Sequence, residues 1–287
     1  MSIPLDSEKI RRLVAGFLRE DVGTGDLTTN SIVPAALRAE GRFVARQDCI
    51  LAGIDIIPYV FELLDPSAQR TLIGRDGERV FAGRPIARVR GRARALLTGE
   101  RVALNILQRL SGIATLTNQF VQAVRSTKAR ILDTRKTTPG WRTLEKYAVR
   151  CGGGYNHRIG LFDAILIKDN HLAVAGGVKP SVERARRQTA PNIPLEVEIS
   201  TPDQLREALE LRVNHVLLDN MTPGQVRRCI GLIRQESGGR KVIVECSGGI
   251  NLRSVKHFAH AGADWISVGA LTHSAPATDI SFEIDLV

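Results

Sequence analysis

The segment LEVEISTPDQLREALELRVNHVLLD, at residues 195–219, decides the fold class of this chain. It predicts two short apolar strands, residues 195–199 and 215–219, joined by an amphipathic helix over residues 202–211. A strand, a crossover helix and a second strand make the repeating unit of a parallel sheet. The segment therefore predicts an α/β fold.

The same alternation continues on both sides of this segment, from residue 113 onward. A further helix is predicted at residues 223–235, and four more apolar strands are predicted at residues 129–134, 164–168, 242–247 and 264–269. Alternating strands and helices imply a parallel sheet, either closed as a barrel or open and doubly wound. Six strands are too few for a regular eight-stranded barrel of about 250 residues. An irregular, incomplete (β/α) barrel over residues 113–274 is the favoured architecture.

Residues 1–112 have a different rhythm. Ser7 is the expected N-cap of a first amphipathic helix, and the polar, glycine-rich residues 21–26 predict a loop. Shorter strand-like runs then dominate, and they suggest an α+β layer. The strands are expected at residues 41–46, 69–74 and 85–90, with helices at residues 54–64 and 98–111.

Composition limits the class of protein. The 287 residues are 43% hydrophobic and 24% charged, which is ordinary for a soluble globular chain. No apolar run is long enough to cross a bilayer, and residues 1–8 lack a signal-like apolar core. The four cysteines are widely scattered, with no CxxC pair, which favours reduced thiols in a cytoplasm over disulfides or a zinc cage.

The net charge of +10 attracts anions of any kind. Nucleic acid, an anionic membrane surface and small polyphosphates all remain open on this ground. Aromatic residues make up only 5%, and no recognition helix or RNA-binding motif is present, so a basic nucleic-acid-binding module ranks low.

Charged residues interrupt the apolar strands near their C-terminal ends. Side chains alternate along a strand, so Glu196 and Glu198 share one face, and other strand ends carry Asp133, Asp219 and Glu245. Buried charges are costly unless they are paired or bind a ligand. Two roles are therefore open for Asp133, Glu196 and Glu245: they serve a site, or they only pair with one another. As a group, the charges predict an active site, because parallel barrels place their chemistry at this face.

Glycine turns follow the last two strands. Ser247, Gly248 and Gly249 follow the fifth predicted strand, and Gly269 follows the sixth. Glycines let a phosphate approach the backbone, and phosphate sites after the final strands recur in barrels. The pair of turns predicts a phosphate-binding site.

Cations gather at three places near these strand ends. Arg135 and Lys136 leave one strand, His157 and Arg158 follow three glycines, and Lys168 ends another strand. Arginine binds carboxylates and phosphates through two parallel hydrogen bonds. So many cations near the carboxylates of the strand ends suit a polyanion bridged by a divalent metal.

Several separated motifs resemble the quinolinate phosphoribosyltransferase family, in order and over nearly the whole chain. The motifs are EDVGTGDLTT at residues 20–29, ERVALN at 100–105, QRLSGIAT at 108–115, TRKTTPG at 134–140, NHR at 156–158, LIKDNH at 166–171, LDN at 218–220 and SGGI at 247–250. The resemblance implies transfer of phosphoribosyl from phosphoribosyl pyrophosphate to quinolinate, with decarboxylation, in NAD biosynthesis. Such an enzyme is a pentosyltransferase that yields nicotinate mononucleotide, carbon dioxide and pyrophosphate.

The resemblance also implies an architecture and an assembly. It implies an N-terminal α+β sandwich over residues 1–112, joined by the closing segment 275–287 with a strand at residues 280–284, and a seven-stranded-type incomplete barrel over residues 113–274. A homodimer with shared active sites is expected, as is a cytoplasmic location.

The same resemblance implies roles for individual residues. Quinolinate would be held by Arg135, Lys136, His157, Arg158 and Lys168, with Arg101 reaching in from a partner subunit. Glu198 and Asp219 would face the ribose and a Mg2+–pyrophosphate, and Lys136, Lys168, Glu198 and Asp219 would be the catalytic residues. The 5′-phosphate would be bound by Ser247, Gly248, Gly249 and Gly269, with His273 nearby. Alternatives are a related phosphoribosyltransferase acting on nicotinate and a molybdate-transport-associated paralogue.

Overall fold

A computed structural model describes residues 6–287 of the chain. The chain divides into two compact units. The first unit comprises the residues up to Asn118 together with Thr143–Gly153 and Ala275–Val287, and the second comprises Gln119–Arg142 and Gly154–Ser274. The sequence placed the first boundary at residue 112, whereas the units separate after Asn118, within helix α4 (Ala93–Val124).

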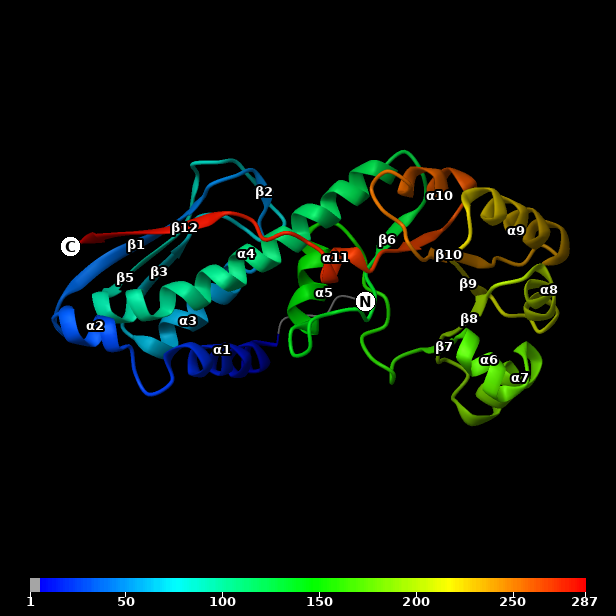
Figure 1. Ribbon diagram of the computed structural model, residues 1–287, viewed down its shortest axis with the longest axis horizontal. Coiled ribbons are helices and arrows are strands. Elements are labelled where there is room, and N and C mark those ends of the chain that lie inside the picture. Colours follow the sequence, from blue (N-terminus) through cyan, green and yellow to red (C-terminus); the bar gives the residue numbers. More distant parts are fainter. Residues whose placement is uncertain (1–5) are drawn as a thin grey trace. The chain divides into compact units, whose positions relative to one another are not determined.

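A four-stranded antiparallel sheet forms the centre of the first unit (Figure 1). Its order is β12-β1-β5-β3, with β1 at Arg38–Ala45, β3 at Gln69–Leu72, β5 at Pro85–Arg92 and β12 at Ile280–Leu286. Strand β12 pairs directly with β1, where Phe43 lies opposite Phe282. The rings of Phe43 and Phe282 are 4.8 Å apart, and Phe61 of the helix α3 (Ile57–Leu64) packs against Phe43 at 6.1 Å. The closing segment therefore belongs to this sheet, as the resemblance implied.

Helices and a short hairpin complete the first unit. Helix α1 (Ser7–Val22) packs on α3, and α5 (Arg142–Cys151) lies almost wholly within this unit. The remaining elements are α2 (Leu27–Ile32), the 3-10 helix η1 (Ile54–Ile56), and the paired short strands β2 (Cys49–Ile50) and β4 (Arg79–Val80).

Helix capping differs from the prediction at the N-terminus. Asp6, rather than Ser7, is the N-cap of α1, because its carboxylate accepts hydrogen bonds from the N–H groups of Glu8 and Lys9. The expected loop at residues 21–26 is shorter, since α1 continues to Val22 and Asp26 caps α2. An aspartate N-cap thus allows a helix to begin within a polar segment.

Six parallel strands form the sheet of the second unit (Figure 1). The sheet order is β6-β11-β10-β9-β8-β7, with bounds β6 Arg130–Leu132, β7 Ile165–Ile167, β8 Leu195–Ile199, β9 His215–Asp219, β10 Ile243–Ser247 and β11 Trp265–Ser267. Strands β6 and β7 are neighbours in sequence but occupy opposite ends of the sheet. Within residues 6–287 they do not pair, and Tyr155 instead forms a single bridge beside Leu132 of β6. The unit is thus an incomplete barrel with the six strands expected from the residues, and the seventh strand that the resemblance implied is represented only by this bridge.

Helices connect these strands in the expected alternation. Helix α8 (Pro202–Glu210) joins β8 to β9, and α9 (Pro223–Glu236) joins β9 to β10; both begin at a threonine N-cap followed by proline. The others are α6 (Asp169–Ala175), α7 (Val178–Gln188), α10 (Val255–Ala261) and α11 (Ala270–His273). Because every crossover returns the chain to the same end of the sheet, the C-terminal ends of the strands meet at one edge.

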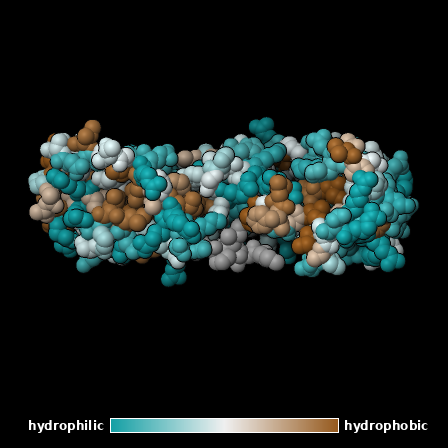
Figure 2. All heavy atoms as spheres, turned by 90° about the horizontal axis from the view of Figure 1, so that it is seen from below, coloured by the Kyte–Doolittle hydropathy of each residue, from teal (hydrophilic) through white to brown (hydrophobic). Residues whose placement is uncertain are grey.

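One face of the molecule is mainly polar (Figure 2). Figure 2 shows one face, on which hydrophilic side chains predominate and hydrophobic side chains gather in separate patches. Among the described helices, none has both the length and the apolar character that a bilayer crossing requires.

Candidate functional site

A cavity of about 790 Å³ opens in the second unit at the C-terminal ends of the strands. It collects twelve of the thirteen site residues proposed from the sequence, from the first strand to the last. These are Arg135, Lys136, His157, Arg158, Lys168, Glu198, Asp219, Ser247, Gly248, Gly249, Gly269 and His273. The remaining residue, Arg101, is exposed on α4 in the first unit and does not line this cavity.

The strands position the acidic side chains. Glu198 lies on β8 and is buried, and Asp219 is the last residue of β9. Burial raises the pKa of Glu198, and the negative charge of Asp219 raises it further. Two carboxylates that repel each other in a cavity provide the oxygen ligands that a hard divalent cation such as magnesium prefers. The donor set at this edge therefore fits such an ion.

The cations surround this acidic pair. Arg158 is half-buried, and its pKa is lowered first by burial and then by the positive charge of Arg135. The buried Nε of Arg135 has no hydrogen-bond partner within residues 6–287. Lys168 is exposed and directly follows β7 as the N-cap of α6. Two neighbouring cations, with an unused donor on one of them, can bind an anionic ligand with more than one negative group.

Backbone geometry explains the glycine turn after β10. Gly248 has φ +94° and Gly249 has φ +62°, both in the left-handed region that favours glycine. A Cβ atom on Gly248 would overlap the side chain of Asn220, whose own N–H donates to the carbonyl of Ser247 at 2.9 Å. The turn therefore exposes its backbone to the cavity, as a phosphate site requires.

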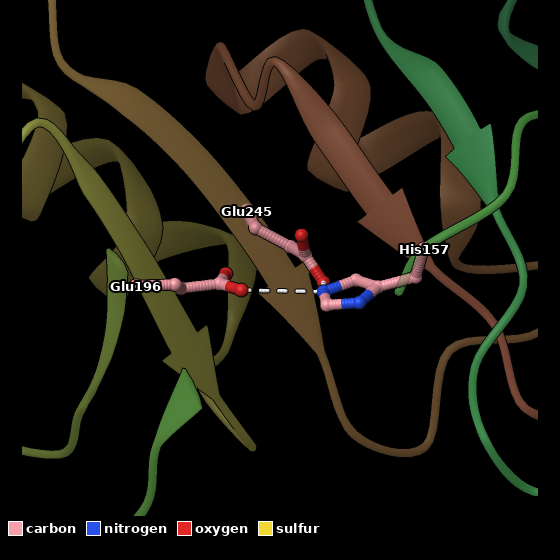
Figure 3. Close-up of side chains that lie close together, drawn as sticks. All are labelled: His157, Glu196 and Glu245. Carbon is pink, nitrogen blue, oxygen red and sulfur yellow. Dashed lines mark hydrogen bonds and ion pairs between the residues drawn. The ribbon is translucent and has the colours of Figure 1, made fainter. Parts of the chain in front are cut away.

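Four side chains form a buried cluster under the cavity, which we call the His–Glu ring: His157, Glu196, His215 and Glu245. Nε2 of His157 lies 3.2 Å from Glu196 and 3.4 Å from Glu245. Nε2 of His215 lies 3.2 Å from Glu196 and 3.5 Å from Glu245. Figure 3 shows both carboxylates pointing toward the imidazole of His157. Each of the two buried glutamates thus contacts both histidines. The two roles left open by the sequence, service in a site or pairing among the acidic residues, did not include these contacts.

Asp133 has its own partners. Its carboxylate accepts hydrogen bonds from the backbone N–H of His157, at 2.9 Å, and from Nδ2 of Asn156, at 2.5 Å. It therefore fastens the turn at residues 156–158.

Two opposing effects act on the pKa of His157. Burial lowers the pKa of His157, but hydrogen bonds with Glu196 and Glu245 outweigh burial and raise it to about 10. Nδ1, however, accepts the backbone N–H of Arg158 at 2.8 Å, so it carries no proton in this arrangement. A second ring proton, on Nδ1, would point directly at that N–H group. The ring proton is therefore on Nε2, between the carboxylates.

Sequence reasoning missed His215, although a signal was present. His215 is two residues before Leu217 and four before Asp219, so strand alternation places all three on one face. Asn220 was also missed as a cavity residue; its φ of +52° follows from the turn and is not readable from residue type.

The chain matches known proteins over nearly its whole length. Family models for the C-terminal and N-terminal domains of quinolinate phosphoribosyl transferase match residues 113–283 and 26–111. A probable nicotinate-nucleotide pyrophosphorylase [carboxylating] of Bacillus subtilis is 45% identical, covering 97% of this chain and 94% of the relative. The nicotinate-nucleotide pyrophosphorylase [carboxylating] of Mycobacterium leprae is 43% identical, covering 96% of each.

The fold is shared with solved structures as well. The nicotinate-nucleotide pyrophosphorylase of Francisella tularensis superposes with a TM-score of 0.91 at 39% identity, covering 98% of each chain. The family resemblance and the fold class expected from the sequence are both confirmed. The chain therefore belongs to the quinolinate phosphoribosyltransferase family.

Proposed function

We propose that this chain transfers phosphoribosyl from phosphoribosyl pyrophosphate to quinolinate with loss of carbon dioxide, giving nicotinate mononucleotide and pyrophosphate. One observation carries the proposal: a single cavity holds cations, an acidic pair and a glycine turn. These three groups match the ring carboxylates, the ribose with its pyrophosphate, and the 5′-phosphate of the two substrates. The relatives named above carry the name of this activity.

The first step is displacement at C1 of the ribose. Arg135, Arg158 and Lys168 bind the two ring carboxylates and hold the pyridine nitrogen in line with C1. A bond forms between that nitrogen and C1 while the bond from C1 to pyrophosphate breaks. Positive charge develops on the ribose, and Glu198 and Asp219 stabilise it because both are carboxylates at the floor of the cavity.

The second step is loss of carbon dioxide. The nitrogen of the nucleotide is cationic, so the ring stabilises the electron pair left when the adjacent carboxylate departs. A proton from solvent then completes the ring carbon. The product keeps one ring carboxylate, and the cations that bound the dicarboxylate substrate still bind this group.

Magnesium is the cofactor we propose, held by Glu198 and Asp219. When bound, such an ion neutralises charge on the pyrophosphate leaving group. Ser247, Gly248, Gly249 and Gly269 are proposed to hold the 5′-phosphate, with His273 beside them. We also propose a homodimer in which Arg101 of each subunit completes the partner's site, and a cytoplasmic location on the ground of the four free cysteines.

The test is a substrate comparison. The purified protein would receive phosphoribosyl pyrophosphate with either quinolinate or nicotinate, and released carbon dioxide and nucleotide product would be measured. Quinolinate should give equal amounts of both, since decarboxylation accompanies transfer, and nicotinate should give little product. Efficient transfer to nicotinate without carbon dioxide release would replace this proposal with a monocarboxylate enzyme.

A further inference from the structure

The His–Glu ring connects the buried side of the sheet to the cavity. Glu196 comes from β8, His215 from β9 and Glu245 from β10, and His157 comes from the turn that follows Gly154. The side chains of Glu196 and Glu245 are 4% and 0% exposed, so each needs a partner to offset its burial. Glu245 also accepts from the hydroxyl of Ser267 at 2.5 Å. Glu196 is not among the residues that line the cavity, so it does not contact a bound substrate directly.

The His–Glu ring is held by contacts between imidazole nitrogens and carboxylate oxygens, and it is not a metal centre. Ligand atoms of His157, Glu196 and Glu245 all lie within 4.8 Å of one another, which is close enough for a shared ion. An imidazole that binds a metal through Nε2 carries its proton on Nδ1. Here Nδ1 of His157 accepts the N–H of Arg158, so Nε2 carries the proton and is not available to a metal.

The imidazole of His157 links the glutamates to Arg158. Its Nε2 faces Glu196 and Glu245, while its Nδ1 holds the backbone N–H of Arg158. The guanidinium of Arg158 lines the cavity, and its Nη1 donates to the carbonyl of Ala164 at 3.0 Å. Moving or rotating the imidazole would therefore shift the backbone from which Arg158 extends.

We infer that Glu196 and Glu245 are positioning residues for the transfer reaction: they hold the His157 ring from the buried side of the sheet and thereby fix the place of Arg158 in the cavity. This inference rests on the proposed function, since Arg158 is there a ligand of quinolinate. Supporting side chains of this kind determine how precisely a binding group is held.

The first test is Glu196→Gln, which keeps the size of the side chain and removes its charge. The KM for quinolinate should rise about 10-fold, as is typical when an outer-shell partner is lost. The KM for phosphoribosyl pyrophosphate should change less than about 2-fold, because the phosphate-binding turn is on other strands. Glu245→Gln is the second variant and should also raise the KM for quinolinate; Glu245 lies on β10, which leads into the phosphate-binding turn, so the comparison with phosphoribosyl pyrophosphate is made on Glu196→Gln alone.

Val197→Ala is the matched control. Val197 is the next residue on β8, is fully buried and points to the opposite face of the sheet. Its truncation lowers stability by leaving a cavity but does not touch the His–Glu ring. Equal increases in the quinolinate KM for Val197→Ala and Glu196→Gln would mean that general destabilisation, not positioning, explains the effect.

A double-mutant cycle then isolates the path through His157. In a His157→Ala background, adding Glu196→Gln should change the quinolinate KM less than about 2-fold, because the imidazole that links Glu196 to Arg158 is already absent. Multiplicative effects of the two substitutions would overturn the inference. In NMR spectra of the imidazole nitrogens, Nδ1 of His157 should be unprotonated in the wild type, and protonation there would also overturn it.

These outcomes separate the two proposals. A wild-type protein that binds quinolinate but transfers nothing contradicts the proposed function. An active wild type whose variants behave multiplicatively contradicts the positioning role alone.

Discussion

Arg135 shows how the cavity is prepared for an anion. Its buried Nε has no hydrogen-bond partner within the described chain, and an unsatisfied buried donor costs about 1–3 kcal/mol. A carboxylate bound to this nitrogen removes that cost. Satisfying this donor therefore contributes to the binding free energy of an anionic ligand.

Removing single cations should test this arrangement. Arg135→Ala and Lys168→Ala should each lower turnover on quinolinate by about 100-fold or more, because each removes a preorganised donor to the substrate. Steady-state assays measure the loss. Arg227→Ala, at an exposed position on α9, should leave turnover unchanged. A near-wild-type rate for Lys168→Ala would remove that lysine from the site.

The glycine turn offers a matched pair of substitutions. Gly248→Ala combines an unfavourable φ with an overlap against Asn220, whereas Gly249→Ala meets no atom within 4 Å. Gly248→Ala should reduce kcat/KM for phosphoribosyl pyrophosphate on the order of 100-fold through displacement of the turn. Gly249→Ala should cost only about 1–2 kcal/mol of stability from its left-handed backbone. Similar kinetics for the two variants would argue against a close backbone approach at Gly248.

The sequence predicts correctly which individual side chains reach the cavity where strand alternation alone decides their direction. The positions of Glu198 and Asp219 in the cavity follow from parity along apolar strands. The shared partners of Glu196 and Glu245 do not follow, because they depend on the distance between strands that are not neighbours in the sheet. The use of Nδ1 in His157 depends on one backbone N–H and leaves no trace in residue type.

Among the elements, the corner between α3 and β5 depends on Asp65. Burial raises the pKa of this carboxyl, but hydrogen bonds from the N–H of Arg92 and from Ser67, with the charge of Arg92, outweigh burial and lower it to about 2. The ionised form is therefore the one that the folded state favours. Its stabilisation is complete above the ordinary value of 3.8 and is lost as the pH falls toward 2.

Asp65→Asn should accordingly lower the free energy of unfolding by about 2 kcal/mol at pH 7. The difference from the wild type should shrink below pH 4 and nearly vanish at pH 2. Denaturant unfolding at several pH values measures this trend. Asp21→Asn, at an exposed position on α1, is the control and should change the free energy of unfolding at pH 7 by less than about 0.5 kcal/mol. A constant difference at all pH values would show that the charge of Asp65 is not responsible.

Element boundaries were predictable only where periodicity was strong. Strands β8 and β9 have the bounds expected from residues 195–219. Helix α4 is far longer than the expected residues 98–111, because Gly112 does not end it: a Cβ there would overlap the backbone of Pro276, so this glycine permits close packing inside the helix. The N-cap at Asp6 was missed because Asp6 and Ser7 are both good caps, and only the backbone geometry selects between them.

For the whole molecule, the position of Arg101 leads to a prediction about assembly. Arg101 is exposed on α4 in the first unit and is not among the residues that line the cavity of the second unit. In a twofold dimer with shared sites, mixing Arg101→Ala and Lys168→Ala subunits gives heterodimers with one intact site. Random exchange should restore about a quarter of the wild-type sites.

Activity after subunit exchange measures this recovery. Each variant alone serves as the control, since neither can form an intact site. Complete inactivity of the mixture, with exchange verified by differently tagged subunits, would contradict a shared site.

The pairing of strands that are far apart in the chain could not be predicted from local sequence patterns. Strand periodicity identifies an apolar stretch near the end of the chain, but it does not say which sheet receives it. The expected return of residues 280–284 came from the family resemblance alone. In the structure, β12 pairs with β1 along Ala39–Ala45, across almost the whole length of the polypeptide.

The pairing of β12 with β1 has a consequence for synthesis on the ribosome. Strand β1 emerges early, yet one of its two edges must wait until more than two hundred further residues have been translated. During that interval a nascent chain exposes an unsatisfied strand edge, a known starting point for aggregation. The order of synthesis therefore leaves this sheet incomplete until β12 has been translated.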